Sequence, residues 1–237
     1  MKAKKIRNVV VFLAAMMLTS CGNSTGITSD KNSLFGEIPY IYEKRQVEVA
    51  KKIKSAIESK DKKAILTLVA EMEEVFEKAK QEAQPLAEKM VGKVLSYKQQ
   101  EKLPYRIISD IRVEKVLLPE IGLISSSNKG TRLRVKFDAV VTDKVKNNFR
   151  LHYLMMSDDE TIDIGCTSML SNKEVGDTLH MEETIYAPEV PSKHLKNCNL
   201  LKFIDDEMYT SEQKNIREKH KQWDAEMKNE LGIKDIK

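Results

Sequence analysis

Three cysteines and four histidines are the side chains of this 237-residue chain best suited to nucleophilic or metal-binding chemistry. The histidines are scattered, and none belongs to a His-Glu-x-x-His motif: His152, His180, His194 and His220. The chain also lacks a Gly-x-Ser-x-Gly motif, a glycine-rich phosphate loop and a Cys-x-x-Cys pair. The sequence therefore points to no catalytic residue, no cofactor and no metal site.

Two acidic clusters, Asp158–Glu160 and Asp205–Glu207, could bind calcium because hard cations prefer carboxylate oxygens. Neither cluster has the spaced ligands and the glycine of a calcium-binding loop. We interpret both clusters as solvated turns.

Cys21 ends a segment with the properties of an export signal. The first seven residues include four basic and no acidic side chains, and an unbroken apolar run follows from Val9 to Leu18. This run is too short for a membrane-spanning helix, which needs about 20 apolar residues. A basic start, a short apolar core and small residues before a cleavage site are typical of a secretory signal.

The residues Leu18-Thr19-Ser20-Cys21 resemble the lipobox of bacterial lipoproteins. The resemblance implies that residues 1–20 are removed, that the Cys21 thiol is joined to diacylglycerol, and that the new amino terminus is acylated. Gly22 in place of an aspartate implies the outer membrane, and the absence of an acidic run after Cys21 favours its periplasmic face. Stable anchoring needs at least two acyl chains, at ~0.8 kcal/mol for each buried methylene, and a triacylated Cys21 meets that condition.

The charge balance argues against a nucleic-acid partner. The chain has 40 Lys and Arg against 36 Asp and Glu, but four of the basic residues belong to the signal peptide, which leaves 36 of each. Binding to a phosphate backbone requires a clustered excess of positive charge. We expect no binding to nucleic acid.

Cys166 and Cys198 remain after Cys21 is assigned to lipid, and an oxidising envelope permits a disulfide between them. Cys166 shares an alternating face with Ile162 and Ile164, so we expect it to be buried. A bridge requires Cα atoms within about 4.4–6.8 Å of each other. If the strands of the two cysteines are not neighbours, both remain thiols.

The N-terminal part of the mature chain is expected to be a tether followed by helices. Residues 21–36 are rich in Gly, Ser, Thr and Asn, which predicts a flexible tether. The next region, 37–103, has apolar residues at helical spacing over 40–59 and 62–84, and the short connection predicts an antiparallel hairpin. Ser59 or Asp61 can cap the second helix, and Pro85 should break or kink it.

The period of the apolar pattern changes from 3.6 to 2 after residue 104. Six segments then read as strands: 105–113, 132–142, 149–156, 162–170, 179–186 and 199–204. Two of them, 149–156 and 199–204, are apolar on both faces, as central strands can be. Six strands at this spacing predict an antiparallel β-sandwich over 104–208.

The central region resembles the small immunoglobulin-like modules of bacterial envelope proteins. Four features carry the resemblance: the alternating strand at 132–142, the polar turn after it, the strand at 149–156, and Gly176-Asp177-Thr178 before the strand at 179–186. The resemblance covers about 100 of the 237 residues. It implies a non-catalytic binding module. The cysteine pair and buried tryptophan of antibody domains are absent as a set.

The last region, 209–237, contains a predicted helix over 211–231, with Thr210 in the position of a capping residue. Its apolar stripe is narrow and suits contact with the hairpin or with one partner: Ile216, His220, Trp223, Met227 and Leu231. The predicted fold class is α+β, with an N-terminal helical hairpin, an antiparallel β-sandwich and a C-terminal helix.

These features predict a lipid-anchored cell-envelope protein that binds a protein or glycan partner. The alternative is a small periplasmic hydrolase whose site is assembled from scattered loops. Binding predicts an exposed apolar or aromatic patch. Hydrolysis predicts a concave pocket that joins a histidine to an acid and a nucleophile.

Overall fold

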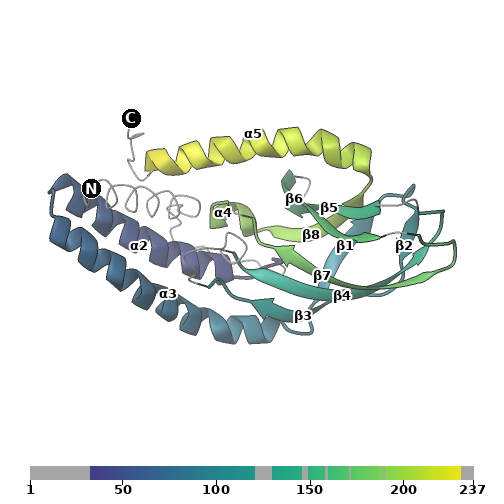
Figure 1. Cartoon of the computed structure of the whole chain (residues 1–237), viewed down its shortest axis with the longest axis horizontal. Helices are drawn as coiled ribbons and strands as arrows, with labels where there is room; N and C mark the ends of the chain where they lie inside the picture. Colours follow the sequence, from purple (N-terminus) through teal and green to yellow (C-terminus); the bar gives the residue numbers. More distant parts are fainter. Residues whose placement is uncertain are drawn as a thin grey trace.

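The computed structural model describes residues 33–120, 130–145, 149–157, 160–170, 172–188 and 190–230. The lipobox, Cys21 and most of the predicted tether lie outside the described residues. Within them the fold is α+β, with an eight-stranded mixed sheet and flanking helices (Figure 1). The elements in chain order are α2 (Ile38–Glu58), α3 (Lys62–Met90), β1 (Val94–Gln99), β2 (Tyr105–Ile107), β3 (Ile111–Leu117), β4 (Arg132–Val141), β5 (Phe149–Ser157), β6 (Glu160–Leu170), β7 (Thr178–Tyr186), α4 (Ser192–Leu195), β8 (Cys198–Ile204) and α5 (Asp206–Glu230).

Helices α2 and α3 form the predicted hairpin. Asp61 caps α3, since its Oδ1 accepts the backbone N–H groups of Lys63 at 3.0 Å and Ala64 at 2.9 Å. Of the break or kink predicted at Pro85, the break is wrong, because α3 continues through the proline to Met90. Ala83 and Ala87 are buried in the core on either side of the proline. Their burial keeps the last turns helical although a proline removes one helical hydrogen bond.

The folded part of the chain begins earlier than the predicted tether boundary at residue 36. Phe35 is fully buried, and Leu34 is almost so. The Leu34 N–H donates to the Cys198 carbonyl at 2.7 Å, and the Ser33 hydroxyl donates to the Leu195 carbonyl at 3.1 Å. The end of the predicted tether is therefore part of the core.

The strands form one mixed sheet in the order β2-β4-β3-β1-β8-β5-β6, with β7 paired to the other side of β4. The predicted sandwich is not confirmed, and the sheet is not wholly antiparallel because β1 and β8 run parallel. Strand β1 lies in the region assigned to helices. The segment 105–113 belongs to two strands, which pair with successive parts of β4. The two segments that are apolar on both faces, β5 and β8, are interior strands as predicted.

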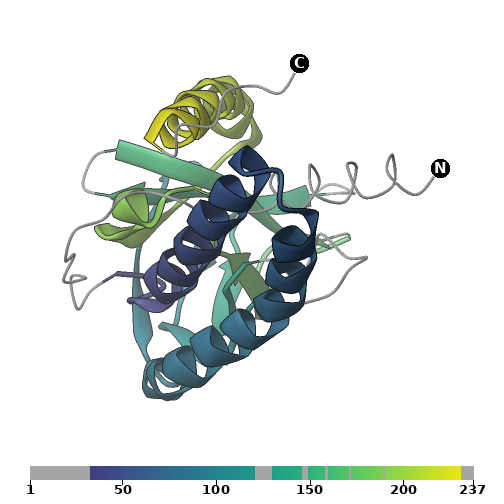
Figure 2. The ribbon, with the colours of Figure 1, turned by 90° about the vertical axis from the view of Figure 1, so that its left-hand side faces the viewer.

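The sheet is strongly bent. Phe137 of β4 and Phe203 of β8 have ring centroids 5.9 Å apart, although β3 and β1 lie between their strands. At about 4.8 Å between neighbouring strands, a flat sheet would separate them by roughly 14 Å. The bend brings Tyr105 and Phe149 to 5.8 Å as well. The concave side of the sheet encloses the core. The start of α2 and the end of α3 pack into this core (Figure 2).

Helix α5 packs against β6 and β5. It begins at Asp206, and its cap is Asp205, whose Oδ1 accepts the Met208 N–H at 2.8 Å. The predicted cap at Thr210 is wrong, since that hydroxyl lies inside the helix and donates to the Asp206 carbonyl. Among the described residues, no helix has the length and apolar character to cross a membrane.

Candidate binding groove

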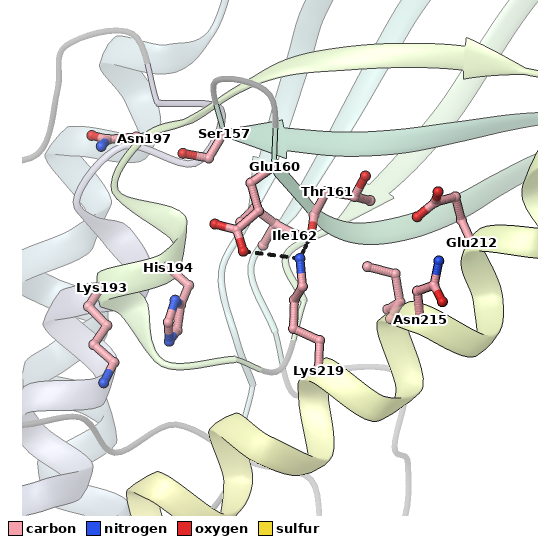
Figure 3. Close-up of a pocket in the computed structure, with 11 residues that line it drawn as sticks. Ser157, Glu160, Thr161, Ile162, Lys193, His194, Asn197, Glu212, Asn215 and Lys219 are labelled. Carbon is pink, nitrogen blue, oxygen red and sulfur yellow. Dashed lines mark hydrogen bonds and ion pairs between the residues drawn. The ribbon is translucent and has the colours of Figure 1, made fainter.

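A groove of about 790 Å³ lies where the end of β5, the start of β6, the segment around α4 and the first half of α5 meet (Figure 3). Its lining is mostly polar, and the apolar exceptions are Ile162 and Ile216. Hydroxyls come from Ser157 and Thr161. Two lysines, two glutamates and two asparagines supply the rest of the hydrogen-bonding groups: Lys193, Lys219, Glu160, Glu212, Asn197 and Asn215. The formal charges of these side chains cancel.

Lys219 joins the two walls of the groove. Its Nζ lies 3.0 Å from Glu160 Oε1 and donates to the Thr161 carbonyl at 2.9 Å. Figure 3 shows the Lys219 and Glu160 side chains meeting in the groove, while Glu212 and Asn215 project from the preceding turns of α5. The amino group also lies 5.7 Å from the ring of Trp223, within reach of a cation–π contact.

A stack of aromatic rings stands behind the groove. The His194 ring lies parallel to Trp223, with centroids 4.0 Å apart, and His220 approaches the same indole at 5.5 Å. Burial and the neighbouring Lys193 lower the pKa of His194. His220 Nε2 lies 3.0 Å from the Ile162 carbonyl and so fixes α5 to β6. Of the predicted stripe, Ile216, His220 and Trp223 thus pack on the sheet and the α4 segment, whereas the side chain of Met227 and all of Leu231 lie outside the described residues.

Helix α2 fixes the position of the segment around α4 through a hydrogen bond. Glu43 of α2 is buried, and its Oε2 accepts the Ser192 N–H at 2.5 Å. Leu195 is buried in the core, which leaves Lys193, His194 and Asn197 at the groove. The hairpin therefore positions one wall of the groove, although it contributes no lining residue.

The serine and the paired glutamate of the groove are not joined to its histidine. The groove's one serine, Ser157, points toward Asn197 and away from His194 (Figure 3). The Glu160 carboxylate is paired with Lys219 and not with a histidine. Among the residues described, no group of three or more His, Cys, Asp or Glu side chains could hold a metal ion.

The remaining histidines lie elsewhere. His180 pairs with Asp138 at 2.7 Å on the exposed face of β4 and β7, and His152 pairs with Asp206 at 2.9 Å below the start of α5. Asp205 and Asp206 thus have structural partners at the helix start. Asp158 and Asp159 lie outside the described residues.

Cys166 and Cys198 are free, and the structure contradicts both the predicted burial of Cys166 and the bridge. Cys166 pairs with His152 on one side of β5, whereas Cys198 pairs with Ser157 on the other side and five residues further along. The two cysteines lie two strands apart and are offset by five residues along the strand direction. This geometry places their Cα atoms roughly 20 Å apart.

A β-bulge explains the exposure of Cys166. The register between β5 and β6 shifts at Met155 and Met156, so that Ile162 is an extra residue in β6. Ile162 faces the main core, but Ile164 packs in the cluster beneath α5. A bulge interrupts the alternation of faces, which the pattern of apolar residues does not reveal.

The exposed apolar patch that the binding hypothesis predicts does not form the groove. The exposed large apolar side chains of the described residues are dispersed over several elements: Ile57, Val91, Val94, Ile108, Val175 and Tyr186. Sequence reasoning singled out the acidic cluster that contains Glu160 and the stripe of α5, but it missed Lys219, Asn215 and Lys193. These residues occupy ordinary polar positions of a helix and a loop, and only the fold brings them together.

Comparison with protein-family models, with curated proteins and with solved structures found no match for this chain.

Proposed function

We propose that this chain is a lipid-anchored protein of the cell envelope that binds a polar glycan–peptide ligand in the groove without chemically changing it. The observation that carries the proposal is the lining itself. Amide, hydroxyl, ammonium and carboxylate groups surround a small apolar floor, and their formal charges cancel. Small-molecule sites are usually lined mainly by apolar side chains with a few polar groups, so a lining that is mostly polar favours a polar ligand.

The chemistry of the lining favours one class of ligand. Hydroxyl-rich sugars and short peptides carry both donors and acceptors and little net charge, which matches asparagine amides beside paired lysine and glutamate groups. A strongly anionic ligand would meet Glu160 and Glu212, and a strongly cationic one would meet Lys193 and Lys219. Cell-wall disaccharide–peptides are the envelope ligands that we propose.

The groove also lies beside the point where the chain enters the fold. Ser33 and Leu34 bond to the carbonyls of Leu195 and Cys198, and the same segment carries the lining residues Lys193 and Asn197. Residues 22–32 separate Ser33 from the proposed lipid on Cys21, and eleven residues span at most about 40 Å. An anchor at Cys21 would hold the groove within that distance of the membrane.

The bent sheet provides the scaffold in this proposal. Its two halves face each other across the core, and the parallel pairing of β1 with β8 distinguishes it from an antiparallel immunoglobulin-like sandwich.

The anchoring is tested by metabolic labelling with palmitate. We expect label on the wild-type chain, and we expect Cys21→Ser to lose the label and to accumulate as unprocessed precursor. Unchanged labelling of Cys21→Ser would refute the lipoprotein assignment.

Ligand binding is tested with the fluorescence of Trp223, the single tryptophan of the chain, which is buried behind the groove. Titration with purified disaccharide–tetrapeptide should change the emission of the wild type. Asn215→Ala, which leaves Lys219 and the ring stack in place, should weaken the apparent affinity about tenfold, the effect of roughly 1.4 kcal/mol. The control is Lys52→Met on the distant hairpin. An emission that does not respond, or equal affinity for both variants, would contradict the proposal.

A further inference from the structure

Cys166 lies in a polar cluster on the surface of β5 and β6, and none of the cluster's residues lines the groove. Its thiol is exposed, and its Sγ lies 4.0 Å from Nη1 of Arg150. Cys166 is paired in register with His152 on β5. Residues directly opposite each other in an antiparallel pair share a face, with Cβ atoms about 4.5–5.5 Å apart.

His152 lies opposite Cys166 in the strand pairing, and two neighbours hold its ring in place. The residue is 9% exposed, its Nε2 lies 2.9 Å from Oδ1 of Asp206, and its ring stacks on Tyr209 at 4.0 Å. Asp206 and Tyr209 thus hold the ring and leave Nδ1 as the nitrogen without a hydrogen-bond partner in a buried position. A buried, unpaired ring nitrogen has a desolvation cost that a proton donor would relieve.

The protonation state of His152 suits a proton acceptor. Burial lowers its pKa, against the opposing effect of Asp206. The imidazole is therefore neutral at pH 7, with a lone pair free to accept a proton. Asp206 accepts from Nε2–H, which selects the tautomer with Nδ1 unprotonated.

We propose that Cys166 is a reactive thiol that forms mixed disulfides by exchange with low-molecular-weight disulfides such as cystine. His152 Nδ1 accepts the thiol proton after a change of the Cys166 rotamer, and the adjacent Arg150 guanidinium stabilises the thiolate. The thiolate attacks one sulfur of the disulfide, a new S–S bond forms to Cys166, and the old S–S bond breaks. The leaving thiolate takes the proton from His152, so the exchange needs no further oxidant.

Cys198 is the internal comparison. It is fully buried, and burial raises the pKa of its thiol to about 12. Cys198 should therefore stay unmodified in the folded chain under conditions in which Cys166 exchanges. The two cysteines differ in exposure and in neighbours, which makes the prediction specific to one site.

The test is the rate at which cystine modifies each cysteine of the full-length chain at pH 7, read by mass spectrometry of peptides. We expect Cys166 to react at least tenfold faster than the same cysteine in a synthetic peptide of its strand, and Cys198 not to react. His152→Gln and Arg150→Gln should each lower the rate of Cys166 modification several-fold. His180→Gln should leave this rate unchanged. Circular dichroism confirms that the variants fold.

The rates of the two variants separate activation from simple exposure. Exposure alone predicts that Arg150→Gln and His152→Gln react at the wild-type rate, because neither substitution removes the thiol from the surface. Activation predicts the slower rates given above. A peptide-like rate in the wild type, or no change in either variant, would overturn the proposal.

Discussion

Lys219 Nζ of α5 lies 3.0 Å from Glu160 Oε1 at the start of β6. One ion pair thus links the two walls of the groove through residues that are 59 positions apart in the sequence. The lysine side chain is 27% exposed and that of the glutamate 57%. Exposed pairs of this kind contribute about 0–1 kcal/mol to stability. The pair therefore matters more for the shape of the groove than for the fold.

Lys219→Met should leave the free energy of unfolding within about 1 kcal/mol of wild type. The same change should weaken binding of disaccharide–tetrapeptide about tenfold, since one wall loses its link to the other. Urea denaturation and isothermal titration calorimetry measure the two effects. Lys136→Met, which removes a lysine paired with Glu114 and Glu182 on the sheet, is the matched control. Equal binding by both variants would contradict a role for Lys219 in the groove.

Gly165→Ala should destabilise the fold. Tyr153 of β5 lies over Gly165 of β6, and a Cβ at Gly165 would overlap the tyrosine ring. Overpacking of this kind costs about 1–3 kcal/mol. Urea denaturation of Gly165→Ala, Tyr153→Leu and the double variant measures the coupling. If the overlap is the cause, the double variant loses less stability than the sum of the single variants, and additive losses would exclude it.

Phe35→Ala should cost about 3–5 kcal/mol of stability, the usual penalty for truncating a buried aromatic side chain. The reason is that Phe35 is fully buried, although it lies in a segment whose composition predicts a tether. Tyr186→Ala is the control, because that ring is 49% exposed and should cost far less. A similar stability of the two variants would show that the segment does not belong to the core.

Stability should fall as the pH falls below about 6.5, the pKa of histidine in an unfolded chain. Burial lowers the pKa of His194 in the fold, so the unfolded chain binds more protons in this range and is favoured. His194→Phe keeps a ring against Trp223 but cannot bind a proton. The melting temperature of the variant should therefore fall less between pH 7 and pH 5 than that of wild type. Parallel curves would show that His194 does not contribute.

The sequence was informative where the pattern is local. The hairpin helices, the Asp61 cap and the alternating strand β4 follow from spacing and from single residues. Strand β1 was missed because Val94 continues the apolar spacing of α3. The helix continues through Pro85 because Ala83 and Ala87 pack in the core, which a short stretch of sequence does not show.

Features that depend on pairing between distant strands were not predictable. The parallel pairing of β1 with β8, the bend of the sheet and the bulge at Ile162 all arise from tertiary packing. The bulge alone reverses the expected environment of Cys166. The groove is non-local in the same sense, because Glu160, Lys193 and Lys219 share no sequence pattern.

The central claim is that the groove binds a cell-wall glycan–peptide. Nuclear magnetic resonance of the ¹⁵N-labelled chain, titrated with disaccharide–tetrapeptide, tests it most directly because the amide shifts locate the ligand. We expect saturable shifts concentrated at residues 160–162, 193–197 and 212–219, and their loss in Asn215→Ala. Absence of shifts at saturating ligand, or shifts centred on the helical hairpin or the β4–β7 surface, would contradict the claim.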